Sequence, residues 1–384
     1  MILVIGGGPA GLAAAAALQR AGMRPVVLEQ ADAIGAAWRG RYKRLRLNTS
    51  RLTSHLPGAR YERGAGLFAS RDAFVAYLER FAERHRIDVR LATRVQRIDR
   101  DDGAWRLRTS GEDMHAEHVI VATGYAHEPC MPPWTGRDVF RPRLLHSAEY
   151  RNAKPFRGRD VLVAGSGCSG MEIAYDLAEG GARRVWMAVR TLPNIVLRSL
   201  GGLPGDPIAV ALLRLPPRVA DTQDRIMRRL VLGDLSQYGL PAPEEGTFAR
   251  FHRLGVAPTV VDKEVIEAIK DRRIEIVQGV RALDATSVKL ADGTRIEPDA
   301  LIAATGYTCG LGPLVGHLGV LDERGLPRTV GGGEAAAGMR FIGYVPMPGQ
   351  IHYVAVEAKR AARAIAHPAG PSRAARPARA RRAG

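Results

Sequence analysis

Cysteine is scarce in this chain, which has only three among its 384 residues. They are Cys130, Cys168 and Cys309, and no two of them stand in the C-x-x-C spacing. This excludes a disulfide framework, a zinc site built on cysteine and a redox-active disulfide of the thioredoxin-reductase kind. The sequence also shows no Ser-His-Asp arrangement and no cluster of metal ligands, so we expect no metal in the site.

Long apolar runs are also missing. The most apolar stretch, residues 1–18, has no basic start and contains glycines at regular positions. We therefore expect it to form a buried strand and a helix, and not an export signal. No other run approaches the roughly 20 residues of a membrane span, so we expect a cytoplasmic protein without a transmembrane segment.

Acidic residues are outnumbered, because 39 Asp and Glu stand against 56 Lys and Arg and give a formal charge of +17. Part of the excess lies in residues 367–384, which are rich in Pro, Ala and Arg and contain no acid. Such a composition cannot bury much apolar surface, so we predict a disordered basic tail there. We favour a solvated arm over a nucleic-acid contact. The remaining positive charge suits an enzyme whose cofactors are polyanions.

Glycine is abundant, with 43 residues, and two clusters of it have the spacing of dinucleotide-binding turns. Each cluster follows an apolar strand, at 2–5 and at 160–164, and precedes a helical sequence. The first glycine permits a tight turn, the second lets the backbone approach a pyrophosphate, and the third allows close packing of helix on strand. The helix N-terminus then offers free N–H groups to the diphosphate. The glycines concerned are Gly6, Gly8 and Gly11 in the first cluster and Gly165, Gly167 and Gly170 in the second.

The residue after the second strand of each half indicates which nucleotide binds there. Glu29 is placed to accept hydrogen bonds from a ribose diol and would repel a 2'-phosphate, so the first site should hold FAD or NAD. At the matching position, the second half has Arg190 followed by Thr191. A charge-assisted hydrogen bond from the guanidinium to a 2'-phosphate contributes roughly 1.5–3 kcal/mol. The second site should therefore prefer NADPH over NADH by about ten- to a hundredfold.

The two halves of the chain repeat one plan. Each contains a strand pair turned at an Asp-Gly dipeptide, at 102–103 and at 292–293, which is a strong hairpin signal. Each then closes with Ala-Thr-Gly-Tyr, at 122–125 and at 304–307. This is the internal symmetry of flavoproteins that bind two dinucleotides. It predicts an α/β fold of two Rossmann-like dinucleotide-binding domains, each with a β-meander, the second inserted into the first.

The segment at 140–150, between the two halves, has a recognisable spacing. It resembles the F-x-G-x-x-x-H-x-x-x-(Y/F) motif of the flavin-containing monooxygenases and their N-hydroxylating relatives, through Phe140, His146 and Tyr150. Pro142 stands where the family has glycine. This departure affects the expected backbone geometry of the loop but not the assignment of the motif. The Baeyer–Villiger relatives end this motif in tryptophan, so Tyr150 favours the branch that oxidises heteroatoms.

Further segments agree with this resemblance, which covers nearly the whole chain except the tail. Residues 35–38 resemble the family's G-G-x-W segment beside the flavin, and 42–49 resemble the next segment, in which an Asn often lies near the reactive flavin edge. Residues 68–78 resemble its Y-P-S-R-D-x-F helix entry. Residues 233–240 resemble a stretch of the plant YUCCA-type indole-3-pyruvate monooxygenases and their bacterial relatives.

The repeat and the resemblance together imply a domain plan. We expect residues 1–155 to form the first part of an FAD-binding domain, 156–307 an NADPH-binding domain, and 308–366 the return segment of the first domain. The second domain carries a helical insertion at about 192–261. Its apolar positions could cover a substrate pocket, lie on a membrane surface or form a subunit contact, and we favour the pocket.

The resemblance implies an FAD- and NADPH-dependent monooxygenase that uses O2. In this family a C4a-(hydro)peroxyflavin oxygenates a small organic substrate at N or S, or decarboxylates a 2-oxo acid such as indole-3-pyruvate. Three alternatives stay open: a flavoprotein NADPH oxidase or reductase without oxygen insertion, a Baeyer–Villiger monooxygenase, and a non-catalytic nucleotide-binding or membrane-surface protein. A homodimer is considered for any of them.

Two residues are expected to act near the chemistry, which the cofactor itself carries. Asn48 is expected to hydrogen-bond the peroxyflavin, with a turn or helix-capping role as the alternative. His146 is expected to brace the interdomain linker and NADPH rather than to transfer a proton. The residues predicted to contact the cofactors are Gly6, Gly8, Pro9, Ala10, Gly11, Glu29, Gln30, Trp38, Asn48, Val95, Thr123, Gly124, Gly165, Ser166, Gly167, Ser169, Gly170, Arg190, Thr191, Thr305, Gly306, Gly349 and Gln350.

Overall fold

The first glycine cluster follows the central strand of a six-stranded sheet. The computed structural model describes residues 1–345, 347 and 349–367. The strands of this sheet are β1 (Ile2–Ile5), β2 (Pro25–Leu28), β3 (Asp88–Arg90), β7 (His118–Val121), β22 (Glu334–Ala336) and β23 (Met339–Phe341). They are arranged in the order β22-β23-β7-β1-β2-β3, and β1 pairs in parallel with both β2 and β7. Segments from both ends of the described chain therefore share one sheet.

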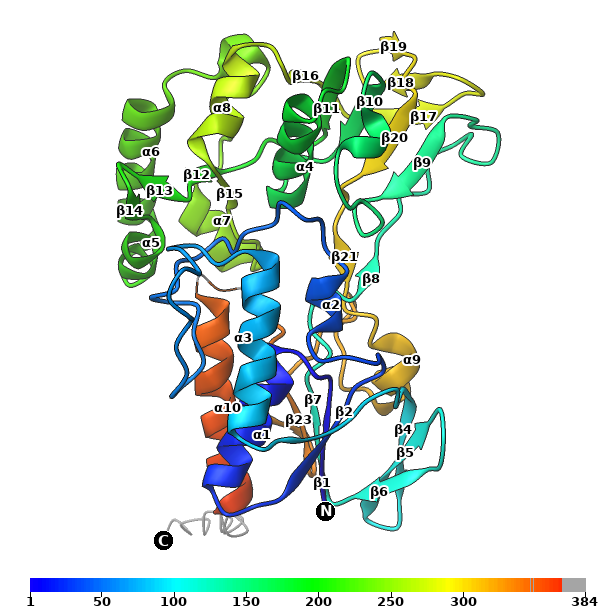
Figure 1. Cartoon of the computed structure of the whole chain (residues 1–384), viewed down its shortest axis with the longest axis vertical. Helices are drawn as coiled ribbons and strands as arrows, with labels where there is room; N and C mark the ends of the chain where they lie inside the picture. The colour runs from blue at the N-terminus through cyan, green and yellow to red at the C-terminus, as the bar shows by residue number, and fades with distance from the viewer. Residues whose placement is uncertain (346, 348, 368–384) are drawn as a thin grey trace, which may run out of the picture.

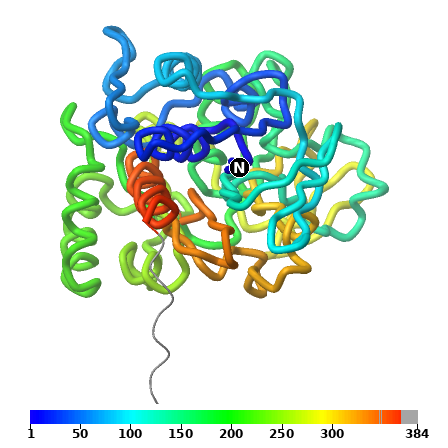
Figure 2. The backbone as a smooth tube through the Cα atoms, turned by 90° about the horizontal axis from the view of Figure 1, so that it is seen from below, coloured from blue at the N-terminus to red at the C-terminus, as the bar shows by residue number. Residues whose placement is uncertain are grey.

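Both faces of this sheet are covered, which explains why β1 is apolar at every position. Val4 packs with the helices α1 (Pro9–Arg20), α3 (Arg71–Arg84) and α10 (Gln350–Ala366). Leu3 and Ile5 point to the opposite face and pack with the meander β4 (Val95–Asp101), β5 (Ala104–Thr109) and β6 (Met114–Ala116), and with α9 (Gly312–Val315). Seen from below, α1 and α10 lie side by side (Figure 2).

The second glycine cluster follows the central strand of a five-stranded parallel sheet. Its strands are β9 (Arg143–His146), β10 (Asp160–Ala164), β11 (Arg184–Val189), β16 (Glu275–Gln278) and β20 (Ala300–Ala303), in the order β16-β11-β10-β20-β9. The helices α4 (Cys168–Glu179) and α8 (Lys263–Lys270) pack on one face. The meander β17 (Val280–Leu283), β18 (Val288–Leu290) and β19 (Arg295–Ile296) covers the other.

Both hairpins expected from Asp-Gly dipeptides are present. Asp102 and Gly103 have φ values of +42° and +83°, as a tight turn with two left-handed residues requires, and they join β4 to β5. Gly293 has a φ of +89° in the turn between β18 and β19. The repeated plan read in the sequence is therefore confirmed at the level of its strands.

The chain crosses between the two sheets along two neighbouring strands. β8 (Glu128–Pro129) and β21 (Tyr307–Thr308) pair in an antiparallel ladder that links the lower and upper parts of the molecule in Figure 1. The sequence put the first boundary at 155 and treated 140–150 as a connection. Instead, β9 already pairs with β20 in the second sheet. Its four residues are too short to be recognised as a strand before their partner is known.

The segment at 192–261, which we call the helical insertion, stands beside α3 and α10 (Figure 1). It contains α5 (Asp206–Leu212), α6 (Pro217–Leu232) and α7 (Thr247–Leu254), with η2 (Ser236–Tyr238) and the hairpin β13 (Ser199–Leu200) and β14 (Leu203–Pro204). The parallel pair β12 (Ile195–Leu197) and β15 (Thr259–Val261) closes it at its base. Asp221 on α6 accepts hydrogen bonds from the backbone N–H groups of Phe248 (2.7 Å) and Ala249 (3.1 Å), which holds α7 against α6.

Two short helices, α2 (Ala36–Arg39) and η1 (Lys154–Phe156), complete the structure together with η3 (Gly316–Leu318). Helix α10 ends at Ala366. The disordered basic tail expected at 367–384 lies, apart from its first residue, outside the described residues.

Candidate active site

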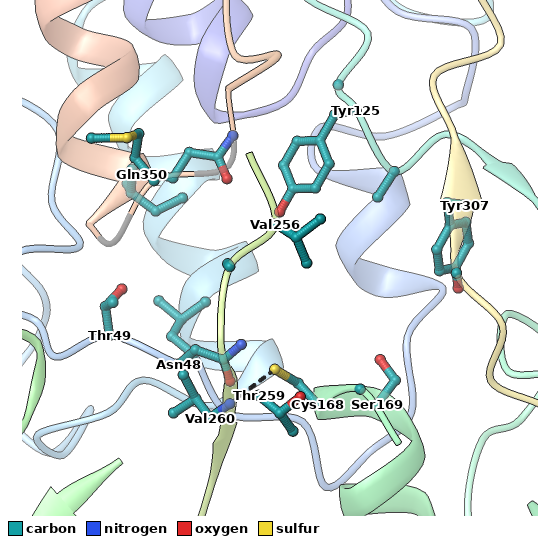
Figure 3. Close-up of a pocket in the computed structure, with 18 of the residues that line it drawn as sticks. Asn48, Thr49, Tyr125, Cys168, Ser169, Val256, Thr259, Val260, Tyr307 and Gln350 are labelled. Atoms are coloured by element: carbon teal, nitrogen blue, oxygen red, sulfur yellow. Dashed lines mark hydrogen bonds between the residues drawn. The ribbon is translucent and has the colours of Figure 1, made fainter. Parts of the chain in front are cut away.

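A single large cavity connects the two glycine turns with the helical insertion. Its volume is about 1540 Å³. That exceeds the range of about 300–1,000 Å³ typical of a site for one small molecule. Its walls come from the carboxyl ends of β1 and β10, from the loop after Tyr42, and from α5, α6 and α7. Figure 3 shows part of this cavity, with Asn48 and Thr49 on one side and Cys168 and Ser169 on another.

The first and third glycines of each turn are required by the protein's own backbone. Gly6 has a φ of +112°, and a Cβ on it would lie 2.6 Å from the carbonyl oxygen of Ala122. A Cβ on Gly11 would lie 1.9 Å from the carbonyl oxygen of Gly6. In the second turn, Gly165 has a φ of +122°, and a Cβ on Gly170 would lie 2.0 Å from the carbonyl oxygen of Gly165. The third glycine of each turn, together with Gly165, does not line the cavity, which fits a packing role.

The second glycine of each turn faces open space. A Cβ on Gly8 or on Gly167 would meet no atom within 4 Å, and both residues line the cavity. They are also the N-cap residues of α1 and α4, and no side chain caps either helix. The first N–H groups of both helices are therefore available to a ligand. This geometry fits a diphosphate at each turn.

Glu29 is held rigidly at the end of β2. One carboxylate oxygen accepts a hydrogen bond from the N–H of Gly7 (2.6 Å), and the other from the N–H of Ala31 (2.9 Å). The side chain is buried and lines the cavity next to Gln30. Each carboxylate oxygen keeps further acceptor capacity, so the group can bind a ribose hydroxyl while it holds the turn.

Arg190 occupies the corresponding position after β11. It is exposed, lines the cavity, and forms no ion pair with an acid of the described chain. The hydroxyl of Ser166 donates a hydrogen bond to the backbone oxygen of Thr191 (3.2 Å), which joins the second glycine turn to this corner. A free guanidinium beside a hydroxyl residue is suited to a phosphate ester.

Asn48 lies on the cavity wall contributed by the loop after Tyr42 (Figure 3). Within the described residues, its side-chain amide makes no hydrogen bond, so it caps no helix and closes no turn there. Trp38 lies on the same wall and packs edge-on against Phe74, with ring centroids 4.6 Å apart. The amide of Asn48 is thus free to contact a ligand.

Most of the other predicted site residues also line the cavity. Thr123 is held by a 2.8 Å hydrogen bond with the hydroxyl of Tyr344, and Gln350 donates to the carbonyl oxygen of Gly343 (3.3 Å). The remaining ones found on the wall are Pro9, Ala10, Val95, Gly124, Ser169 and Gly306.

Three further predicted residues lie behind the wall. The hydroxyl of Thr305 donates to the carbonyl oxygen of Cys130 (2.6 Å), so it stabilises the crossing between the sheets. Gly349 has a φ of +72° and begins α10, where a Cβ would meet Thr53 at 3.3 Å. His146 is the third.

His146 is buried at the end of β9 and does not line the cavity. Its Nδ1 accepts a hydrogen bond from the N–H of Ala148 (3.1 Å), so its Nε2 carries the hydrogen and donates to the carbonyl oxygen of Gly306 (3.0 Å). Burial lowers the pKa of His146, and the bond to Gly306 acts in the opposite direction. Both ring nitrogens of the neutral side chain are therefore hydrogen-bonded, and the residue holds the end of β9 against the loop at Gly306.

The sequence favoured a pocket-covering role for the helical insertion, and its helices do line the cavity. Residues at helical spacing on α6 face the cavity, namely Gln223, Asp224, Met227, Arg228 and Val231. Apolar side chains of α5 and α7 complete this wall, among them Leu212, Phe248 and Phe251. The periodicity of α6 predicted a helix, but no sequence signal told which face would be turned inward.

Among the residues of α6 that line the cavity, Arg228 carries the positive charge. It is half-buried, and burial lowers its pKa while Asp224 acts against this. Asp224 accepts a hydrogen bond from the hydroxyl of Thr247 (2.6 Å), and no ion pair joins it to Arg228 in the described chain. The cavity therefore has a guanidinium without a carboxylate partner beside an apolar wall.

A buried ionic cluster connects three distant segments at the base of the cavity. Arg198 of the insertion pairs with Glu172 of α4 and with Asp262 (2.8 Å). The hydroxyl of Tyr42, from the loop after α2, donates to Glu172 (2.6 Å). Burial raises the pKa of Glu172, and Arg198 acts against that rise. Apart from the buried Nε of Arg198, which has no hydrogen-bond partner in the described residues, these groups bind one another, which indicates a structural role.

The structure adds two negative findings. No group of His, Cys, Asp and Glu side chains suited to a metal ion occurs in residues 1–345, 347 and 349–367. Over the same residues, no helix has both the length and the apolar character needed to cross a bilayer.

Comparison with known proteins shows the family. Over residues 3–194 the chain matches the family described as pyridine nucleotide-disulphide oxidoreductase. The indole-3-pyruvate monooxygenase YUCCA1 of Oryza sativa subsp. japonica is 36% identical over 310 residues, which are 79% of this chain and 76% of that protein. The probable indole-3-pyruvate monooxygenase YUCCA9 of Arabidopsis thaliana is 33% identical over 336 residues, or 85% of this chain and 79% of the other.

A solved structure shows the same fold. The flavin-containing monooxygenase of Stenotrophomonas maltophilia has a TM-score of 0.72 at 23% identity, and the match covers 95% of this chain and 97% of the other. The chain belongs to the class B flavin-containing monooxygenase family, and it is an NADPH-dependent flavin monooxygenase with FAD and NADPH as its cofactors.

Proposed function

We propose that the six-stranded sheet binds FAD and that the five-stranded sheet, inserted into the first domain, binds NADPH. The observation that carries this proposal is the single cavity that opens onto both glycine turns. Gly8 and Gly167 leave room for a diphosphate at each helix N-terminus. Glu29 then accepts the ribose hydroxyls of FAD, and Arg190 with Thr191 binds the 2'-phosphate of NADPH.

Bound together, FAD and NADPH supply the electrons and the oxygen activation that place one atom of O2 on the substrate and release the other as water. The protein's own part is to position the reactants and to exclude water. Trp38 and Asn48 form the wall beside the flavin, and the free amide of Asn48 is placed for a hydrogen bond to the reacting group. His146 acts as a positioning residue, because its ring fixes Gly306 on the cavity wall.

For the substrate, we propose a 2-oxo acid with an apolar side chain, of the indole-3-pyruvate type. The relatives named as indole-3-pyruvate monooxygenases support this class. So does the insertion wall, which offers aromatic and aliphatic side chains and the unpaired guanidinium of Arg228 for a carboxylate. The balanced reaction takes the 2-oxo acid, O2, NADPH and a proton to the shortened carboxylic acid, CO2, water and NADP⁺.

Product analysis tests this assignment. The purified FAD-loaded protein is given NADPH, air and one compound at a time: indole-3-pyruvate, a tertiary amine, a sulfide or a cyclic ketone. We expect indole-3-acetate and CO2 in a one-to-one ratio to the NADPH consumed, and little product from the others. An N-oxide, sulfoxide or lactone as the main product would overturn the 2-oxo acid proposal. Hydrogen peroxide equal to the NADPH consumed with every compound would favour the oxidase alternative.

The cytoplasmic location and the homodimer stay predictions from the sequence.

A further inference from the structure

We propose that the outward face of α6 docks on a membrane surface that contains anionic phospholipids. Exposed apolar side chains gather in this part of the molecule. Of the fifteen large apolar side chains that are exposed in the described residues, seven lie between positions 203 and 230. They include Leu230, which is 77% exposed, and Leu203, which is 71% exposed. Scattered apolar residues are ordinary on a protein surface, but such a concentration marks an interaction site.

The apolar residues form a stripe along α6. Val219, Ile226 and Leu230 follow the spacing i, i+7, i+11, which places them within about 20° of one line on the helix. This stripe points away from Arg228 and Val231, whereas Gln223 and Met227, which also line the cavity, lie beside it on the helix. In Figure 2 the helices of the insertion stand at the edge of the molecule, away from both sheets. The stripe is therefore free to meet a flat surface.

A second stripe, of arginines, runs beside the first. Arg218, Arg225 and Arg229 repeat the same spacing one residue earlier, and all three are exposed. We call the two stripes together the α6 outer face. A helix with an apolar stripe flanked by basic residues is the pattern of a segment that lies in the plane of an anionic membrane.

The two acids of α6, and Asp206 of α5, do not reach this face. Asp206 is buried and accepts hydrogen bonds from Ser50 (2.9 Å) and Thr53. Asp221 is buried, where it caps α7, and Asp224 binds Thr247 on the inner side. Just beyond α6, the exposed Asp234 lies near Arg229, so three arginines stand beside a single exposed acid. The exposed charge here is therefore mainly positive, which favours a negatively charged partner and disfavours a second copy of the same face.

The cavity opens near the same face. Ile208 of α5 and Met227 of α6 are both exposed and also line the cavity, so they form part of its mouth. Figure 1 places α5, α6 and the β13–β14 hairpin together on one side of the molecule. A protein docked by α6 would bring this mouth close to the lipid surface, from which an apolar substrate can enter.

Co-sedimentation with vesicles tests the proposal on the full FAD-loaded chain. Vesicles of phosphatidylcholine alone are compared with vesicles that also contain phosphatidylglycerol. Because the whole chain carries a formal charge of +17, charge alone attracts it to anionic lipid, and the decisive variant must keep the charge. That variant is Ile226→Gln with Leu230→Gln. The matched control is Leu91→Gln with Val139→Gln, two exposed apolar residues away from the insertion.

We expect the wild-type protein and the control to bind anionic vesicles, and the α6 variant to bind about tenfold or more weakly. NADPH oxidation in lipid-free buffer should be the same in all three, because none of these residues lines the cavity. Equal binding by the α6 variant would overturn the proposal and assign the interaction to charge elsewhere. A wild-type dimer that the α6 variant converts to a monomer would also overturn it, in favour of a second copy as the partner.

Discussion

Glu29 and Arg190 occupy the same position in the two halves and carry opposite charge. Each is the first residue after the strand that follows its glycine turn and helix, and both line the cavity. Glu29 is fixed by two backbone N–H groups, whereas Arg190 has no acidic partner in the part of the chain that the structure describes. We propose that this one position in each site selects between a nucleotide with a free ribose and one with a 2'-phosphate.

Replacing Arg190 by Gln should change the preference between the two nicotinamide nucleotides. The lost charge-assisted bond is worth roughly 1.5–3 kcal/mol, so flavin reduction by NADPH should need about ten- to a hundredfold more nucleotide. Reduction by NADH should change little. The rate of anaerobic flavin bleaching with each nucleotide measures this. Arg184→Gln on the same strand is the control, and an equal loss with NADPH and NADH would contradict the assignment.

Replacing Arg228 by Gln should weaken binding of anionic substrates. We expect the apparent KM for indole-3-pyruvate to rise about tenfold or more, since an ionic hydrogen bond to a carboxylate is lost. Flavin reduction by NADPH without substrate should stay unchanged. Arg229→Gln, the exposed neighbour on the same helix, should leave both quantities unchanged. An unaltered KM in the Arg228 variant would exclude this residue from the carboxylate site.

At the scale of single elements, different glycines of one turn serve packing and ligand binding. A Cβ on Gly11 would overlap the carbonyl oxygen of Gly6, whereas a Cβ on Gly8 would meet only the open cavity. We therefore expect Gly11→Ala to lower the melting temperature of the FAD-free protein, while Gly8→Ala leaves it nearly unchanged but weakens FAD binding. Thermal unfolding and FAD titration measure the two effects. Equal destabilisation by both variants would contradict this division.

The buried His146 at the end of β9 should make the free energy of unfolding depend on pH. Burial lowers the pKa of His146 below 6.5, so the folded protein holds the ring neutral while the unfolded chain takes up a proton first. The stabilisation from His146 is complete above about pH 6.5 and is lost as the pH falls through that value. Urea unfolding should show a shallower loss between pH 7 and pH 5 in His146→Gln than in wild type. Identical slopes would mean that the ring is not held neutral.

Local elements were predictable from sequence, and contacts between distant ones were not. The glycine turns, Glu29 and the Asp102-Gly103 hairpin each carry a signal within a few residues. β9 carried none, because its four residues become a strand only by pairing with β20. The cluster of Tyr42, Glu172 and Arg198 joins three segments that no local pattern connects.

For the whole molecule, two dinucleotide folds enclose one reaction space. The crossing strands β8 and β21 bring the glycine turns to a shared cavity, and the helical insertion adds a further wall to it. Sequence predicted the two folds and favoured a pocket under the insertion, but it did not show which residues of the insertion would form the wall. This arrangement fits an enzyme that couples NADPH oxidation to oxygen transfer within one shared cavity.

The most direct test of that coupling follows the fate of the oxygen. The FAD-loaded protein is supplied with NADPH, ¹⁸O₂ and indole-3-pyruvate, and the acid product is examined by mass spectrometry. We predict one ¹⁸O atom in each indole-3-acetate, with one NADPH consumed per product and little hydrogen peroxide. Product without the label, or peroxide equal to the NADPH consumed, would contradict a monooxygenase.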